Sequence, residues 1–177
     1  IMVKDNYLSL KDQYIQIYES GIDSTPYEYE NGDLLFESAD SGIDAYLWAD
    51  GDLFVGQIEG GHFGDLGYFR WIDDSEYMGE LKDDQRMGQG IMVFKDALYT
   101  GDFDMGELTG NAMLQWQDGY FFVGQFEEGQ VKGLAKRIKP DVVFHLGQFI
   151  DGQPEGYGLY SDKEGISYFG TFNKGEM

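Results

Sequence analysis

Residues 54–58 read Phe54-Val55-Gly56-Gln57-Ile58, a glycine with an aromatic residue two positions before it and an apolar residue two positions after it. The motif returns five times, as Tyr77-Met78-Gly79-Glu80-Leu81, Tyr99-Thr100-Gly101-Asp102-Phe103, Phe122-Val123-Gly124-Gln125-Phe126, His145-Leu146-Gly147-Gln148-Phe149 and Tyr168-Phe169-Gly170-Thr171-Phe172. Successive anchor glycines stand 22 or 23 residues apart. A fixed period of this length predicts a repeat array whose units stack around one continuous core.

Each repeat is numbered here from its anchor glycine as position 0, and its pattern predicts one β-hairpin. Apolar residues at alternate positions predict the first strand. A glycine at position +5 predicts the hairpin turn, because positive φ costs glycine nothing; Asp84 replaces it in one repeat. The return strand carries glycine at +9 and often at +11, an apolar residue at +13, and large aromatics at +15, including Trp48, Trp71 and Trp116.

The parity of these positions predicts the sheet. Positions −2, 0 and +2 share a face of the first strand, and +9 to +15 by twos share the same face of the return strand. Aromatic rings from adjacent strands can lie over the glycines, so that one layer builds its own core. We therefore expect an all-β protein: a single-layer, elongated, twisted antiparallel sheet of successive β-hairpins, with one hairpin per 22–23 residues.

These residues resemble the MORN repeat, whose pattern is an aromatic, a glycine, a second aromatic, a Gly-x-Gly pair and an Asp-Gly turn. The resemblance covers about residues 30–177, a predicted single continuous domain of about six repeats. A degenerate first repeat is centred on Asp33; it lacks the aromatic and the anchor glycine but keeps Leu35, Gly42, Tyr46, Trp48, Asp50 and Gly51.

Residues 1–29 fall outside this register, and we expect them to form a separate N-terminal cap. The run Tyr14-Ile15-Gln16-Ile17-Tyr18 alternates like a strand, which favours a strand-rich cap. Leu8, Lys11, Asp12, Tyr14 and Ile15 fit a short helix equally well. Some cover is needed, because an unpaired sheet edge invites association with other chains.

Composition limits the function. The 177 residues carry a net charge of −21, no cysteine and two histidines. Such an acidic surface repels phosphate backbones, so nucleic acid is an unsuitable partner. No apolar run spans a membrane and no signal peptide is recognisable. We expect a soluble, cytoplasmic protein; the first residue, Ile1, leaves an exported mature chain open as the alternative.

No motif for chemistry stands out. Neighbouring carboxylates such as Asp73 and Asp74 arise by chance in so acidic a chain. The sequence lacks a nucleophile elbow, a phosphate-binding loop and a paired-histidine zinc motif, and its glycines mark hairpins instead of opening helices. We predict no catalytic residue, no cofactor and no metal site, and hence no enzyme.

A first candidate site is a cluster of basic residues that breaks the aromatic pattern. Arg137 and Lys139 stand at +13 and +15, His145 stands at −2, and Lys132 and Lys136 flank them. Such a cluster suits an anion or an acidic peptide. Alternatively, the aliphatic stems cover neighbouring rings, with cation-π contact to Tyr160 or Phe122.

A second candidate site is a row of apolar residues on the opposite parity, where a half-exposed sheet should be polar. Position −1 holds Val55, Met78, Val123, Leu146 and Phe169, and position +12 holds Tyr68, Ile91, Met113 and Leu159. Such a row would form a groove for an extended or helical partner. The alternatives are cross-strand pairing within the sheet, or cover by residues 1–29.

The resemblance to MORN repeats implies a scaffolding role, since the family binds or dimerises with other proteins and accompanies catalytic domains without performing their chemistry. We therefore expect a noncatalytic protein-protein interaction module, with homodimerisation open. The alternatives are a peripheral phospholipid-headgroup binder acting through the basic cluster, and a glycan-binding or glycan-cleaving surface of aromatics and acids.

Overall fold

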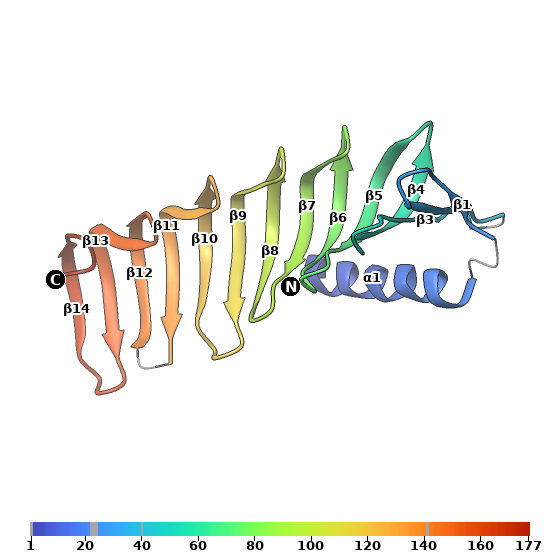
Figure 1. Ribbon diagram of the computed structural model, residues 1–177. Coiled ribbons are helices and arrows are strands. Elements are labelled where there is room, and N and C mark those ends of the chain that lie inside the picture. The colour runs from blue at the N-terminus through green and yellow to red at the C-terminus, as the bar shows by residue number, and fades with distance from the viewer. Residues whose placement is uncertain (1, 22–24, 40, 141) are drawn as a thin grey trace. The chain divides into compact units, whose positions relative to one another are not determined.

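The computed structural model describes residues 2–21, 25–39, 41–140 and 142–177 (Figure 1). The chain divides into two compact units, Ile1–Lys95 (unit 1) and Asp96–Met177 (unit 2). Strand order follows the chain from β1 to β14. Within each unit, every strand pairs antiparallel with its neighbour in sequence. The predicted all-β fold of successive hairpins is confirmed.

Unit 1 comprises one helix and seven strands: α1 (Met2–Gly21), β1 (Tyr27–Glu28), β2 (Leu34–Phe36), β3 (Asp44–Leu47), β4 (Leu53–Glu59), β5 (His62–Arg70), β6 (Glu76–Lys82) and β7 (Gln85–Val93). Unit 2 comprises seven strands: β8 (Ala97–Asp104), β9 (Glu107–Trp116), β10 (Phe121–Glu127), β11 (Gln130–Lys139), β12 (Val142–Ile150), β13 (Gln153–Asp162) and β14 (Ser167–Phe172). The anchor glycines lie within β4, β6, β8, β10, β12 and β14, as the register predicts.

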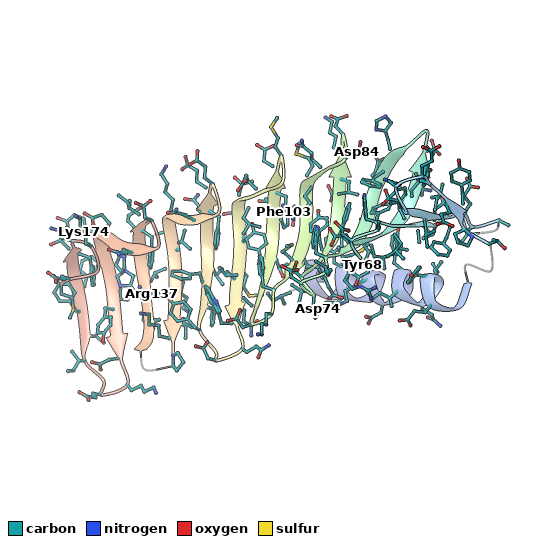
Figure 2. All side chains as sticks on the ribbon, viewed as in Figure 1. Tyr68, Asp74, Asp84, Phe103, Arg137 and Lys174 are labelled. Atoms are coloured by element: carbon teal, nitrogen blue, oxygen red, sulfur yellow. The ribbon has the colours of Figure 1, made fainter. Side chains whose placement is uncertain are left out.

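The turns at positions +4 and +5 explain why glycine recurs there. Glu128 and Gly129 have φ values of 50° and 75°, and Asp151 and Gly152 have 50° and 71°. Positive φ at both residues of a two-residue loop is the type I′ geometry, whose twist matches that of the flanking strands. Asp84, which replaces the glycine in its repeat, takes a φ of 60° and so adopts the same turn at a hairpin tip (Figure 2).

The aromatic at position −2 fills the space left by the glycines. A Cβ atom on Gly90 would stand 2.7 Å from Cε2 of Tyr77, and one on Gly56 would stand 2.5 Å from Cζ of Phe54. Gly90 belongs to the strand next to Tyr77, whereas Gly56 belongs to the same strand as Phe54. In these two repeats the ring covers its own anchor glycine as well as the neighbouring strand, whereas Gly101 and Gly124 face Ala112 and Ala135 of the next strand. Part of the packing is therefore within a strand, where the sequence predicted packing between strands.

The N-terminal segment is helical, so the expectation of a strand-rich cap is wrong. α1 lies against unit 1 and contacts β4, β6 and β7 (Figure 1). Five residues from Tyr14 to Tyr18 fit either pattern, but the longer series has the spacing of one helical face. That series, which packs on the sheet, is Tyr7, Leu8, Leu10, Tyr14, Ile15 and Tyr18. Within the described residues, no helix is apolar enough over a sufficient length to cross a membrane.

Residues 1 and 22–24 of the predicted cap lie outside the described residues. The proposed boundary between cap and array, at residues 29 and 30, stays a prediction.

Candidate interaction surfaces

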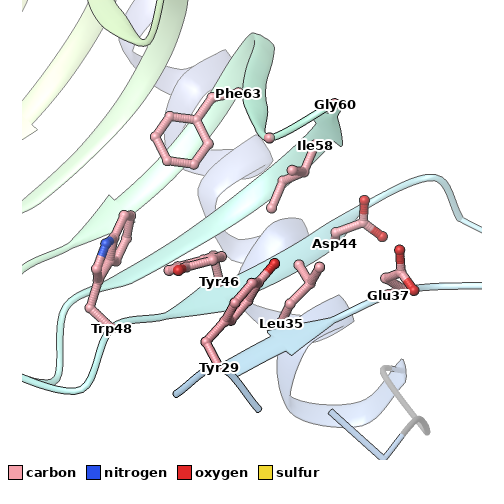
Figure 3. Close-up of a pocket in the computed structure, with 10 residues that line it drawn as sticks. Tyr29, Leu35, Glu37, Asp44, Tyr46, Trp48, Ile58, Gly60 and Phe63 are labelled. Atoms are coloured by element: carbon pink, nitrogen blue, oxygen red, sulfur yellow. The ribbon is translucent and has the colours of Figure 1, made fainter. Parts of the chain in front are cut away.

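An aromatic cleft of about 410 Å³ lies on the glycine-bearing face of unit 1 (Figure 3). Four rings line it, those of Tyr29, Tyr46, Trp48 and Phe63. Neighbouring centroids are 5.8 Å apart for Tyr29 and Tyr46, 4.8 Å for Tyr46 and Trp48, and 6.0 Å for Trp48 and Phe63. Leu35, Ile58, Gly60 and Gly61 complete the apolar lining, and Glu37 and Asp44 lie at the other end.

Strand alternation and one buried carboxylate place these rings. Tyr46 lies on β3 and Trp48 follows two residues later, at positions +13 and +15 of the degenerate first repeat. The Tyr46 hydroxyl donates to Oδ2 of Asp33 over 2.7 Å, and the Ala49 N–H donates to Oδ1 over 2.9 Å. These bonds hold the pKa of Asp33 below its ordinary value. Asp33 thus ties the two halves of the degenerate hairpin together.

Burial, followed by the bond to Asp33, raises the pKa of Tyr46 to about 12. Its hydroxyl therefore stays protonated at neutral pH and keeps donating to Asp33. The ring edge facing the cleft is fixed in one orientation, which favours preorganised binding.

A second, acidic recess of about 590 Å³ adjoins the cleft and shares Glu37, Asp44 and Ile58 with it. Glu59 adds a third carboxylate. Asp44 accepts the Ser38 N–H over 2.9 Å. No group of three or more potential ligands with metal-binding geometry occurs among the described residues. The negative recess and the apolar cleft together form one continuous surface with two chemistries.

The structure brings part of the predicted basic cluster together: Arg137 is paired with His145 in the strand register, and burial, followed by the charge of Arg137, lowers the pKa of Lys139. Lys132 pairs with Glu127 near a hairpin tip, Nζ to Oε2 being 2.7 Å. Arg137 lies over the Phe149 ring at 5.6 Å and Lys139 over the Tyr120 ring at 5.4 Å, both on the glycine-bearing face. Lys136 points to the opposite face, over the Phe144 ring at 5.6 Å. Arg137, Lys139 and His145 thus share one face, whereas Lys132 and Lys136 have contacts of their own, and a joint anion site on the five residues stays a prediction.

His145 is buried, with 1% of its surface exposed. Its ring occupies the aromatic position of its repeat, at 4.4 Å from the Phe172 ring and 5.1 Å from the Phe149 ring. Neither ring nitrogen has a hydrogen-bond partner among the residues that the structure describes. Burial, and next the charge of Arg137, lower its pKa to about 4, so the imidazole is neutral at pH 7. It packs as an aromatic and is not presented to an outside ligand.

The predicted apolar row lies on the face opposite the glycines, and each strand contributes one residue to it. We call it the central row. In unit 1 it runs through directly paired residues of β3 to β7. All five are fully buried with α1 packed against them: Ala45, Val55, Tyr68, Met78 and Ile91. In unit 1 the N-terminal segment therefore covers the row, which was one of the two alternatives to a partner groove.

In unit 2 the central row continues through directly paired residues of β8 to β14. These are Thr100, Met113, Val123, Lys136, Leu146, Leu159 and Phe169. Val123, Leu146 and Phe169 are 44%, 43% and 76% exposed. The same repeat positions are thus buried in one unit and open in the other.

Two further rows flank the central row from β9 to β14; most neighbours in them are paired directly, and a register shift separates Gln125 from Leu134, Ile138 from Phe144 and Gln148 from Tyr157. On one side they are Asn111, Gln125, Leu134, Gln148, Tyr157 and Thr171; on the other they are Gln115, Phe121, Ile138, Phe144, Ser161 and Ser167. We call these rows, with the central row from Met113 onward, the open face. Lys136 is its one charged residue, in a protein with a net charge of −21.

The aromatic cleft was not among the sequence-predicted sites. Tyr29 lies before the repeat register begins, and Phe63 stands at a position without a repeat signature. The signal that was available is the clustering of aromatics in the degenerate first repeat, where Tyr46 and Trp48 are kept although the anchor glycine is lost.

The MORN repeat family model matches residues 77–96, 99–119 and 145–166. The matches begin at Tyr77, Tyr99 and His145, each at position −2 of its repeat. The chain carries MORN repeats. The repeats anchored at Gly56, Gly124 and Gly170 lie outside these matches but follow the same strand register. No curated protein matches the sequence.

A solved structure shares the fold at low sequence identity. The TCP domain of Drosophila melanogaster SAS-4, in complex with a proline-rich motif of Ana2, is 13% identical, with 86% of each chain covered and a TM-score of 0.55. The TCP10 domain of Danio rerio CPAP is 12% identical, and the alignment covers 84% of this chain and 83% of that domain with a TM-score of 0.38. The first likeness supports the open-sheet fold; the second is too distant to carry an argument.

Proposed function

We propose that this MORN-repeat chain is a noncatalytic protein-interaction module whose aromatic cleft binds an extended, proline-containing segment of a partner with a basic residue beside it. The observation that carries the proposal is the cleft of four rings next to three carboxylates. Proline-rich segments dock in aromatic-lined grooves because their extended helix is already ordered before binding.

The acidic recess sets the second requirement of the ligand. Glu37, Asp44 and Glu59 provide negative charge at one end of the cleft. A lysine or arginine next to the proline stretch would enter this recess and pair with the carboxylates, and Arg also stacks on aromatic faces. The SAS-4 domain, whose complex holds a proline-rich motif, supports the ligand class by analogy of fold alone.

The lipid and glycan alternatives receive no comparable support. The basic residues proposed for a headgroup lie on different faces, and Lys132 is paired with Glu127. The three tryptophans are half-buried between neighbouring rings instead of standing free on a platform.

The test is titration of the full chain with a synthetic peptide that carries Pro-Pro-x-Pro followed by Arg-Arg, measured by calorimetry. We expect binding in the micromolar range and a loss of at least tenfold in affinity for Glu37→Lys, since Glu37 is exposed and lines both cavities. Glu164→Lys changes the net charge equally but lies in unit 2, and is expected to bind like the unaltered protein.

Trp48→Ala and Trp116→Ala form a second matched pair, because both residues stand at position +15 and only Trp48 lines the cleft. Weaker binding in the first variant alone supports the site. Equal affinity for a peptide with the prolines replaced by serine, or an unchanged affinity in Glu37→Lys, would show that the cleft is not the binding site.

A further inference from the structure

The central row in unit 1 shows what covers this face of the repeats. Val55, Tyr68, Met78 and Ile91 lie completely out of solvent with the apolar side chains of α1 packed against them. Polar contacts orient the helix: the Tyr7 hydroxyl donates to Oε1 of Glu80 over 3.2 Å, and Lys11 pairs with Glu76. Within unit 1, this face is therefore a helix-binding surface with its helix in place.

Unit 2 has the same row and, among its described residues, no helix. Its open face carries ten apolar side chains among eighteen positions, and the most exposed of them are Leu134, Tyr157 and Phe169 at 54%, 70% and 76%. Contiguous exposed apolar area with few charges marks interaction sites on proteins. Acidic residues are absent from these positions although they outnumber basic ones nearly threefold in the whole chain.

We propose that the open face of unit 2 binds an amphipathic helix of a partner protein, one that carries a carboxylate for Lys136. The inference is independent of the aromatic cleft, which lies in unit 1 and takes an extended segment.

The spacing of the sheet fits a helix that crosses the strands. Adjacent strands lie about 4.8 Å apart, close to the helical pitch of about 5.4 Å, so residues at i, i+3 or i+4, and i+7 meet successive strands. The six strands from β9 to β14 span roughly 24 Å, which a helix of about 16–20 residues covers. α1, which contacts β4, β6 and β7 in the same way, has 20 residues.

Charge decides the chemistry of the helix. In unit 1 the sheet supplies the carboxylate, Glu76, and the helix supplies Lys11. On the open face the sheet supplies Lys136 instead, with its Nζ over the Phe144 ring and directly paired with Val123 and Leu146 in the strand register. The arriving helix therefore needs an acidic residue within its apolar stripe, since a buried unpaired lysine would weaken the complex.

A second copy of this chain fits less well. Two copies would each bring a net charge of −21, and each open face would present a lysine without a carboxylate to meet it. An extended peptide that pairs with a sheet edge would leave the open face uncovered, because β-augmentation uses backbone groups.

The test is selection of binders to the full chain from a displayed library of 20-residue amphipathic helices. Selected helices are expected to hold apolar residues at i, i+3, i+4 and i+7 with an acidic residue in that stripe. Their Kd is expected to rise at least tenfold with Leu146→Asp, and to stay unchanged with Ile166→Asp, an exposed residue of unit 2 outside the open face.

Charge reversal gives the sharper readout. Lys136→Glu is expected to weaken binding at least tenfold, and replacement of the acidic residue of the helix by lysine is expected to restore it. Circular dichroism of each variant confirms that it is folded. Failure to select any binder, or binders indifferent to Leu146→Asp, overturns the proposal. A chain that is dimeric in solution and becomes monomeric with Leu146→Asp overturns it too, because the occupant is then a second copy. Binding of the proline peptide to the cleft is unaffected by either result.

Discussion

At the scale of single residues, His145 shows how the repeat register exposes an exception. Five of the six repeats place phenylalanine or tyrosine at position −2, and the repeat anchored at Gly147 places a histidine there. The imidazole is buried beside the rings of Phe149 and Phe172, and within the described part of the chain both its nitrogens lack a hydrogen-bond partner. A buried polar group without a hydrogen bond costs about 1–3 kcal/mol. The histidine ring thus fills the aromatic position of its repeat, but its two unpaired nitrogens lower the free energy of unfolding.

We predict that His145→Phe stabilises the protein and flattens its response to acid. The folded-state pKa is lowered to about 4, below an unfolded value of about 6.5, so the unfolded chain binds more protons between these values. Stability from the neutral histidine is therefore complete above pH 6.5 and is lost as the pH falls towards 4. Urea unfolding at pH 7 and pH 5 should show the unaltered protein losing roughly 1–2 kcal/mol more than His145→Phe.

The other histidine is the control for this prediction. His62 is exposed and bonds to Oδ2 of Asp84 over 2.8 Å, which raises its pKa. Its contribution has the opposite sign, because stability is present at low pH and lost as the pH rises through its folded-state pKa. The His62→Gln variant should therefore still show the loss of stability at acidic pH that is due to His145. An equal loss of stability in His145→Phe and in the unaltered protein would contradict the assignment.

At the scale of elements, the strands were predictable and the helix was not. The hairpins follow from positional requirements that only a few residues meet: positive φ at +5, and an unoccupied Cβ position beneath rings such as those of Phe54 and Tyr77. α1 has no such requirement, because it depends on packing against Val55, Met78 and Ile91, which are distant in sequence. Tertiary contacts thus decided between two local patterns that the sequence left nearly equal.

The candidate surfaces divide in the same way. The central row was predictable from parity, since one residue per strand recurs at fixed repeat positions. Whether that row is covered depends on α1, which no repeat pattern encodes. The aromatic cleft depends on Tyr29, which turns back through its N–H bond to the Asp33 carbonyl, and on Phe63 of a different hairpin. A periodic sequence pattern does not reveal a site that is built from irregular segments.

We predict that Leu8→Asp in α1 lowers the stability of the protein by about 2–3 kcal/mol, because it places a charge against the apolar row of unit 1. Gln13→Asp is the matched control: it adds the same charge to the exposed side of the same helix. Chemical denaturation followed by circular dichroism measures both. A loss as large in Gln13→Asp would attribute the effect to helix charge instead of packing.

At the scale of the whole molecule, charge and apolar surface are segregated. None of the eighteen positions of the open face holds an acidic residue, although the chain has 33, of which 27 fall within residues 1–130. Such a distribution gives solubility and discourages contact with anionic partners, while it leaves one apolar surface free for a selected ligand. Net charge of this size also destabilises the folded state through self-repulsion.

We therefore predict that NaCl raises the midpoint of thermal unfolding. Increasing the ionic strength from about 0.02 M to 0.2 M shortens the screening length from about 20 Å to about 7 Å, which weakens repulsion among surface carboxylates. Ion pairs such as Lys11–Glu76, His62–Asp84 and Lys132–Glu127 oppose this effect, but 33 acidic residues face only 12 lysines and arginines in the sequence. Calorimetry should show an increase of several degrees, equal for NaCl and KCl at matched ionic strength because screening depends on charge and not on ion type. A midpoint that falls with salt would mean that attractive pairs outweigh repulsion, whereas an increase in sulfate alone would assign the gain to strengthened apolar burial.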